Sequence, residues 1–240
     1  MGALPLAFSG HCRVPMLTTI HGFSGPDILP AYRTADSAYV SISDADRTPE
    51  LTYRATVYHG VDLDVLPYSA RAGDDLVILG RIHPDKGTAD AIDIARRAGR
   101  RLRIAGIVQD DAYFRHEVEP HIDGDRVVYL GSVGPAERAE VLGGALALLH
   151  PISFAEPFGL AVVEAMAVGT PVIAYPRGAM PEIVDHQVTG FLVSDPAAAA
   201  AAVDLAATLD RHRIRRVAEH RFSAARMAED YLAVYAELIH

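Results

Sequence analysis

The chain has 240 residues, half of them hydrophobic and 22% charged, which predicts a packed globular protein and excludes a disordered one. Its net charge of −9 argues against a general nucleic-acid binder, and its single cysteine, Cys12, excludes a disulfide framework and a multi-cysteine zinc site. No apolar run approaches the ~20 residues of a membrane helix, and the opening residues lack the pattern of a secretory signal. We therefore expect a soluble, cytoplasmic protein.

Residues 1–70 contain strand-like segments in VPMLTTIHGF, DSAYVSIS and RATVYHGV, with a helix-like stretch between the first two. This is half of an α/β domain, too small to form a sheet covered by helices on both faces. We expect a partial N-terminal α/β domain with an exposed apolar surface through which the chain self-associates or takes up a partner. The polar segment 67–75 indicates a linker.

From residue 75 onward, short strands alternate with helices. Strands are expected over 75–80, 101–108, 125–131, 145–151, 170–176 and 191–195, and helices over 88–99, 111–122 with a break at Pro120, 135–144 and 160–169. The strands are rich in Val, Ile and Leu and do not alternate, so helices should cover both of their faces. Repeated units of this kind predict an α/β domain over residues 71–225 with a complete, doubly wound parallel sheet.

The last 45 residues are helical by pattern, with one helix starting at Pro196. The final helix carries an apolar stripe that we interpret as core packing rather than a cofactor surface. The stripe is formed by Met227, Tyr231, Val234 and Leu238. The arginine-rich runs 96–103 and 211–216 are interpreted as solvated helix faces and loop edges.

Residues 153–172 follow the end of a predicted strand with a loop and a helix that begins near Gly159, and in parallel sheets this edge binds ligands. Free N–H groups at the helix start suit a phosphate, and Gly159 lets a ligand approach the backbone. Glu156 on the loop is placed to reach a sugar, and Glu164, about one turn into the helix, to accept from ribose hydroxyls. The alternative is that Glu156 is a loop charge and Glu164 only complements the helix dipole.

The segment LGRIHPDKG, residues 79–87, leads from another strand to another helix at the same edge. Its cations Arg81 and Lys86, the latter the only lysine of the chain, are spaced to bind two phosphates. The alternative is an ordinary surface pair. Neither a Walker A loop nor a dinucleotide-binding fingerprint occurs in the chain.

Taken in order, GRIHPDKG, EPFGLAVVEAMAVGTPVIA and GAMPEIVDHQVTGFLV resemble the donor-binding domain of family 4 retaining glycosyltransferases, which have the GT-B fold. TTIHGF, AYVSISDADR and TVYHGVDLDVL resemble the closing part of that family's N-terminal, acceptor-side domain. The resemblance covers about residues 14–240. Relatives have a longer N-terminal region that includes a glycine-rich loop, so we expect a fragment, a chain completed by a partner, or a chain that has lost catalysis.

The resemblance implies a catalytic or binding role for five side chains. Arg81 and Lys86 would bind the donor pyrophosphate and stabilise the charge of the leaving diphosphate. Glu164 would hold the nucleotide ribose and Glu156 a hydroxyl of the donor sugar. His21, in TTIHGF, matches the family's histidine beside the donor sugar at the interdomain cleft.

The resemblance also implies roles for the backbone. The amides of Phe158, Gly159 and Leu160 would contact sugar and phosphate, and the C-terminal helix, residues 226–240, would cross back to the N-terminal part. The chain has His59 and a glycine where the family usually has Asn-Gly, a turn that we interpret as structural.

The expected function is transfer of a sugar, with retention, from a nucleoside-diphosphate sugar to an unknown acceptor, without a metal or other cofactor and without nucleic acid. A UDP-sugar is favoured over a GDP- or ADP-sugar. Three alternatives stay open: a nucleotide-sugar-binding module without catalysis, an epimerase or phosphorylase on the same fold, and an interaction protein that binds no nucleotide.

Overall fold

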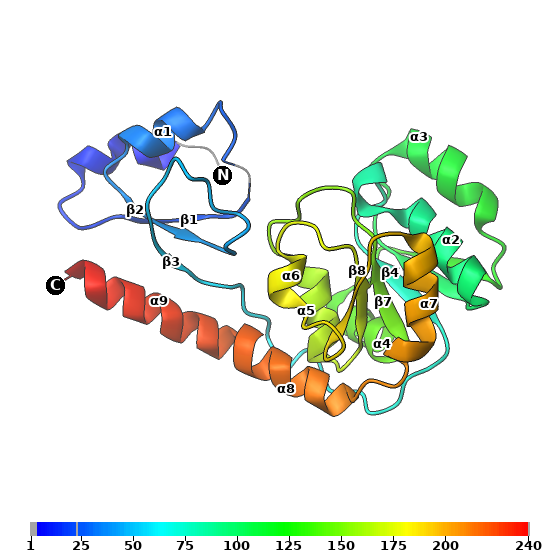
Figure 1. Cartoon of the computed structure of the whole chain (residues 1–240). Coiled ribbons are helices and arrows are strands. Elements are labelled where there is room, and N and C mark those ends of the chain that lie inside the picture. Colours follow the sequence, from blue (N-terminus) through cyan, green and yellow to red (C-terminus); the bar gives the residue numbers. More distant parts are fainter. Residues whose placement is uncertain (1–3, 23, 240) are drawn as a thin grey trace.

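The computed structural model describes residues 4–22 and 24–239, and it contains two parallel sheets joined by long C-terminal helices (Figure 1). The first sheet belongs to the N-terminal part, residues 4–66. Its elements are a 3-10 helix (Leu4–His11), β1 (Leu17–Ile20), α1 (Leu29–Thr34), β2 (Ala38–Ser41) and β3 (Tyr53–Thr56). The three strands pair in the order β1-β2-β3, with Leu17 opposite Ala38 and Val40 opposite Ala55.

The second sheet belongs to a larger six-stranded domain. Its strands are β4 (Leu76–Leu79), β5 (Leu102–Ala105), β6 (Val127–Gly131), β7 (Ala147–His150), β8 (Val172–Ala174) and β9 (Gly190–Leu192). Its helices are α2 (Thr88–Ala98), α3 (Asp111–Tyr113), α4 (Pro135–Gly143), α5 (Leu160–Ala167), α6 (Met180–Ile183) and α7 (Pro196–Ala206), and α8 (Arg211–Phe222) and α9 (Ala224–Ile239) follow.

The six strands are all parallel and pair in the order β6-β5-β4-β7-β8-β9. Strands β4 to β6 therefore follow one another toward one edge of the sheet, and strands β7 to β9 follow one another toward the other edge. The predicted doubly wound parallel sheet is confirmed. Ligands of such sheets bind outside the carboxyl ends of the two strands where the order reverses, here β4 and β7.

Two apolar cores cover the two faces of this sheet. Helices α2 and α7 contribute Ile92, Ala199 and Val203 to one core, and helices α5 and α8 contribute Met166 and Phe222 to the other. The central strands are buried on both faces, which explains why their sequences show unbroken apolar runs rather than alternation.

Helix ends follow the sequence closely where a capping residue is present. Asp195 accepts a hydrogen bond from the N–H of Ala198, so α7 starts at Pro196 as predicted. The prediction of a helix over 111–122 that breaks at Pro120 is wrong in detail. The chain widens to a π-helix over Phe114–Val118 and then tightens to a 3-10 turn, because Pro120 has no N–H to donate and its ring crowds the preceding turn.

The stripe on α9 packs on the N-terminal sheet, as Figure 1 shows for the helix that runs along β1–β3. Val234 is buried with Val40 and Val57, and the hydroxyl of Tyr231 lies 2.8 Å from that of Thr19. The interpretation of this stripe as core packing is confirmed.

The chain passes between the two parts at two places that are bonded to each other. The N–H of Val61 donates to the carbonyl of Phe222 at 2.8 Å, and the N–H of Ala224 donates to the carbonyl of Val61 at 3.0 Å. The ring of Phe222 is fully buried between Tyr58 and Phe158. The junction is therefore continuous with the core of the six-stranded domain.

The segment 67–75 has no regular secondary structure, but it is fixed to the six-stranded domain. Arg211 donates from its guanidinium to the carbonyls of Ser69 (2.9 Å), Gly143 (2.8 Å) and Ala145 (3.0 Å), and burial lowers its pKa. Arg215 donates likewise to the carbonyls of Leu66 and Ala167. The interpretation of the run 211–216 as a solvated face is thus wrong for these two arginines.

None of the helices that the structure describes is long and apolar enough to span a membrane.

Candidate functional site

Two loops leave the carboxyl ends of β4 and β7: the lysine loop, residues 80–87, and the glutamate loop, residues 151–159. They are bonded directly, because the N–H of Ser153 donates to the carbonyl of Asp85 at 3.0 Å. Gly87 has φ of 71°, and a Cβ at this position would collide with the carbonyl of Pro151. Only glycine lets the two loops approach so closely, so they form one unit at the edge predicted to bind a ligand.

An ion pair joins the two loops. Nζ of Lys86 lies 2.5 Å from Oε2 of Glu156, and the two side chains are only 16% and 13% exposed. The same Nζ lies 4.6 Å from the centre of the Phe154 ring. Since burial removes both charges from water, each depends on the other for compensation. The sequence predicted that Lys86 and Glu156 share an edge; the structure brings them into contact.

A buried histidine lies beside this ion pair. Nε2 of His150, at the end of β7, is 3.8 Å from Oε2 of Glu156, and the side chain is 6% exposed. This Nε2 has no hydrogen-bond partner among the described residues. Burial, and secondly the charge of Lys86, lower the pKa of His150 to about 3. The imidazole is therefore neutral at pH 7 and adds no charge to the site.

The stability of the protein should depend on pH through this imidazole. An unfolded histidine binds a proton below about pH 6.5, whereas His150 in the folded chain does so only near pH 3. Stability is therefore lost as the pH falls from about 6.5, and at pH 4 the loss from His150 is on the order of 3 kcal/mol. Urea unfolding at pH 7 and pH 4 measures it. The variant His150→Leu should lose less stability than the wild type over this interval; an equal loss would contradict a buried neutral histidine.

The two cations of the lysine loop have different partners. Arg81 is exposed, and its guanidinium donates to the side-chain carbonyl of Gln109, which follows β5. Lys86 turns to Glu156 instead. His83, between them, accepts from the N–H of Asp85 and closes the 3-10 turn Pro84–Lys86. Arg81 and Lys86 therefore contact different neighbours, and the side chain of His83 stabilises the turn between them.

The glutamate loop ends at the N-terminus of α5. Gly159 has φ of 96°, and a Cβ there would lie 2.6 Å from Cε of Met180, so no other residue fits without strain. The N–H groups of Gly159 and Leu160 find no backbone acceptor among the described residues, as expected for the first turn of a helix. The ring of Phe158 is buried, so only its backbone is available to a ligand.

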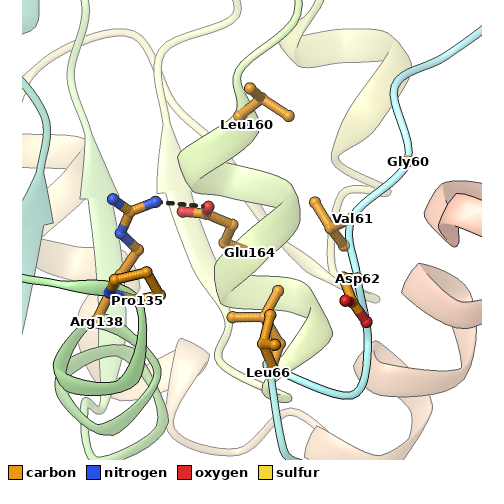
Figure 2. Close-up of a pocket in the computed structure, with 9 residues that line it drawn as sticks. Gly60, Val61, Asp62, Leu66, Pro135, Arg138, Leu160 and Glu164 are labelled. Carbon is orange, nitrogen blue, oxygen red and sulfur yellow. Dashed lines mark hydrogen bonds and ion pairs between the residues drawn. The ribbon is translucent and has the colours of Figure 1, made fainter.

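Glu164 faces a cavity of about 240 Å³ beside α5 (Figure 2). Oε1 of Glu164 accepts a hydrogen bond from Nη1 of Arg138, on α4, at 2.8 Å. The cavity is lined by Gly60, Val61, Asp62, Val65, Leu66, Pro135, Arg138, Leu160 and Glu164. The sequence did not predict the contact of Arg138 with Glu164, because an arginine in an amphipathic helix is usually an exposed surface charge.

His21 lies in the N-terminal part, across from the glutamate loop. Its ring is exposed and stacks on that of His59 with centres 5.1 Å apart, and the His59 ring meets Phe158 edge-on at 5.0 Å. Burial, and then the nearby His21 and Arg226, lower the pKa of His59 to about 4. His59 thus lies between His21 and the glutamate loop.

The N-terminal part is tied to the six-stranded domain by contacts that the sequence analysis missed. The carboxylate of Glu182 accepts from the N–H groups of Asp44 (2.8 Å) and Ala45 (2.6 Å), and from the hydroxyl of Tyr58 at 3.1 Å. The hydroxyl of Ser43 donates to the carbonyl of Pro157, in the glutamate loop, at 2.6 Å. We call these the interdomain bonds; they fix the strand-end loop of β2 against the site.

Asp46 connects this loop to His21. Its Oδ2 accepts from the N–H of Gly22, the neighbour of His21, at 3.1 Å. Burial raises the pKa of Asp46 to about 6.

Two parallel-sheet units joined by paired crossings, with the carboxyl edge of the larger sheet facing the smaller unit, are typical of the GT-B class of fold. Within that class, the chain belongs to the family described as glycosyl transferases group 1, whose model matches residues 71–221.

Relatives and solved structures agree with this assignment. The chain is 35% identical over 225 residues to a D-inositol 3-phosphate glycosyltransferase of Mycolicibacterium smegmatis, covering 82% of this chain and 49% of that protein. The corresponding protein of Nocardia farcinica is 30% identical over 280 residues, which cover 93% of this chain and 61% of that protein. The chain thus spans about half to three fifths of the length of these curated relatives.

Among solved structures, Anabaena HepE in complex with UDP-glucose matches with a TM-score of 0.82 at 20% identity, over 98% of this chain and 76% of that one. AviGT4, a glycosyltransferase involved in avilamycin A biosynthesis, matches with a TM-score of 0.75 at 26% identity, over 98% and 77%. The expected GT-B fold is confirmed.

Proposed function

We propose that this chain carries the donor site of an enzyme that transfers a sugar from a UDP-sugar to an acceptor. The observation that carries the proposal is the buried pair of Lys86 and Glu156 at the reversal point of the sheet. It lies beside the N–H groups of Gly159 and Leu160, which have no backbone acceptor among the described residues. A UDP donor is favoured because the solved HepE structure holds UDP-glucose. Retention of configuration, membership of family 4 and a cytoplasmic location belong to the proposal as expectations from the sequence.

The ion pair suggests how the site takes up its donor. When a diphosphate arrives, Nζ of Lys86 can exchange the carboxylate of Glu156 for a phosphate oxygen, which leaves Glu156 to accept from a sugar hydroxyl. As the bond between the anomeric carbon of the sugar and the diphosphate oxygen breaks, the diphosphate leaves with the electron pair. The oxygen of the acceptor hydroxyl forms the new bond to this carbon, and the hydroxyl proton passes to the departing diphosphate. Lys86 and the N–H groups at the start of α5 then stabilise the growing negative charge. Arg81 would contact the outer part of the pyrophosphate from the open side of the lysine loop, and His21 would lie beside the sugar.

The N-terminal part has exposed apolar side chains and an open sheet edge. Phe8 and Val14 are exposed there, and β1 has no partner on its outer edge among the described residues. We propose that the chain self-associates or takes up a partner at this edge. A sedimentation coefficient that does not change with protein concentration, in the purified chain alone, would contradict self-association.

Thermal unfolding with UDP, GDP and ADP tests the donor site. A nucleotide at 100 times its Kd should stabilise the folded chain by about 2.7 kcal/mol, and we expect this shift with UDP. Glu164→Gln should reduce it, whereas Glu237→Gln, on the exposed face of α9, should not. The absence of a shift with every nucleotide would contradict the proposal.

A nucleotide-sugar-binding module without catalysis is the second candidate, because the side chains named for the site would all contact the donor. Such a module would show the UDP shift without releasing UDP from UDP-glucose.

A further inference from the structure

Arg138 is the cationic side chain among those that line the cavity beside Glu164 (Figure 2). It projects from α4, on the opposite side of the cavity from Val61 and Leu66. Its side chain is 36% exposed, and its Nε is shielded from solvent without a hydrogen-bond partner among the described residues. The guanidinium is therefore held in place chiefly by Glu164.

The contact with Arg138 uses only one oxygen of the carboxylate. Nη1 of Arg138 donates to Oε1 of Glu164 at 2.8 Å, and the described residues give Oε2 no hydrogen bond. The Glu164 side chain is 17% exposed, so few water molecules compete for this second oxygen. Oε2 is left as a charged acceptor at the cavity wall.

The rest of the lining offers a ribose little else to bind. Val61, Val65, Leu66 and Leu160 are apolar, and Asp62 is the other side-chain acceptor. Hydroxyl groups that enter the cavity need a fixed acceptor, and a carboxylate on a flexible glutamate is fixed only if something holds one of its oxygens.

On the basis of the proposed function, we propose that Arg138 is a positioning residue for nucleoside recognition. It holds Oε1 of Glu164 so that Oε2 faces the ribose hydroxyls of the bound nucleotide. The charge-assisted hydrogen bond from Nη1 to Oε1 restricts the rotation of the carboxylate and leaves the second oxygen for a ligand. Arg138 therefore sets how strongly the site distinguishes a ribose from a deoxyribose.

Calorimetric titration with UDP and 2′-deoxy-UDP tests this role. A hydrogen bond to a charged group corresponds to about tenfold or more in affinity, so the wild type should prefer UDP over 2′-deoxy-UDP by about that factor. Arg138→Gln should reduce the preference to that of Glu164→Gln, and the double variant should show no further reduction. Arg138→Lys should retain part of it.

Matched measurements separate this role from a loss of folding. Arg126→Gln removes an exposed arginine outside the cavity and should keep the full preference. Melting temperatures without ligand show whether each variant is folded. A full preference in Arg138→Gln, together with a lost preference in Glu164→Gln, would overturn the inference but leave the donor site intact. Failure of the wild type to bind UDP would overturn the proposed function itself.

Discussion

Replacing Lys86 with methionine should lower the rate of UDP release from UDP-glucose by about 10²–10³-fold, the usual effect of removing one electrostatic contact to a developing charge. The side chain keeps its length and apolar stem but loses the ammonium that lies 2.5 Å from Glu156. Binding of UDP should weaken as well, because the same Nζ would contact the diphosphate before and after the reaction. Single-turnover release of UDP and the UDP-induced melting shift measure the two effects.

The same substitution should also destabilise the folded chain. It leaves the carboxylate of Glu156 buried without its cation, and breaking a buried pair in this way costs about 3–5 kcal/mol. The double variant Lys86→Met with Glu156→Leu should recover much of this stability and remain inactive, which separates the two consequences. Lys86→Arg keeps the charge and is the matched control. A Lys86→Met protein that still shows a full UDP shift would contradict the placement of Lys86 at the diphosphate.

Phe222→Ala should produce the largest loss of stability among core substitutions, about 3–5 kcal/mol. The Phe222 ring is fully buried at the junction of the two parts, with its centre 5.9 Å from that of Tyr58 and 6.1 Å from that of Phe158. Removing it opens a cavity under the glutamate loop as well as between the two parts. Urea unfolding at pH 7 gives the loss of free energy.

A substitution that leaves a smaller cavity at the same position is the control for this prediction. Phe222→Leu should cost less than half as much, and Leu232→Ala, on the exposed side of α9, should have little effect. Because the ring packs against Phe158, Phe222→Ala should also weaken UDP binding in the fraction that stays folded. An unchanged free energy of unfolding would mean that the junction does not contribute to the core.

Much of the six-stranded domain could be predicted because local sequence is enough to specify it. Its strands β4 to β8 are short apolar runs that end at, or within two residues of, a glycine or proline. The rule for parallel sheets then places the lysine loop and the glutamate loop at one edge. The same rule cannot say which side chains touch. The contact of Lys86 with Glu156 depends on how Gly87 and Pro151 pack. Because 70 positions separate the two charges, the sequence does not show that they pair.

The contacts that could not be predicted from the sequence have one physical reason in common: each depends on a partner that folding brings from far along the chain. Glu182 bonds to backbone N–H groups 137 and 138 positions earlier, and Ser43 to a carbonyl 114 positions later, so no helical or strand periodicity marks them. Arg211 and Arg215 look like surface charges until the chain folds and brings unpaired carbonyls to them. Arg138 differs from an ordinary helix-surface arginine only because Glu164 lies opposite.

The interdomain bonds have a thermodynamic consequence. Ser43 holds the carbonyl of Pro157, and Glu182 holds the backbone next to Ser43, so the glutamate loop and the N-terminal part share one set of hydrogen bonds. If a ligand of the N-terminal part and a ligand of the glutamate loop both bind more tightly when these bonds are formed, each raises the affinity of the protein for the other. The factor is the same in both directions, because coupling between two binding equilibria is reciprocal. On the proposed function, the affinity for a nucleotide at the glutamate loop would then report whether the N-terminal part is occupied.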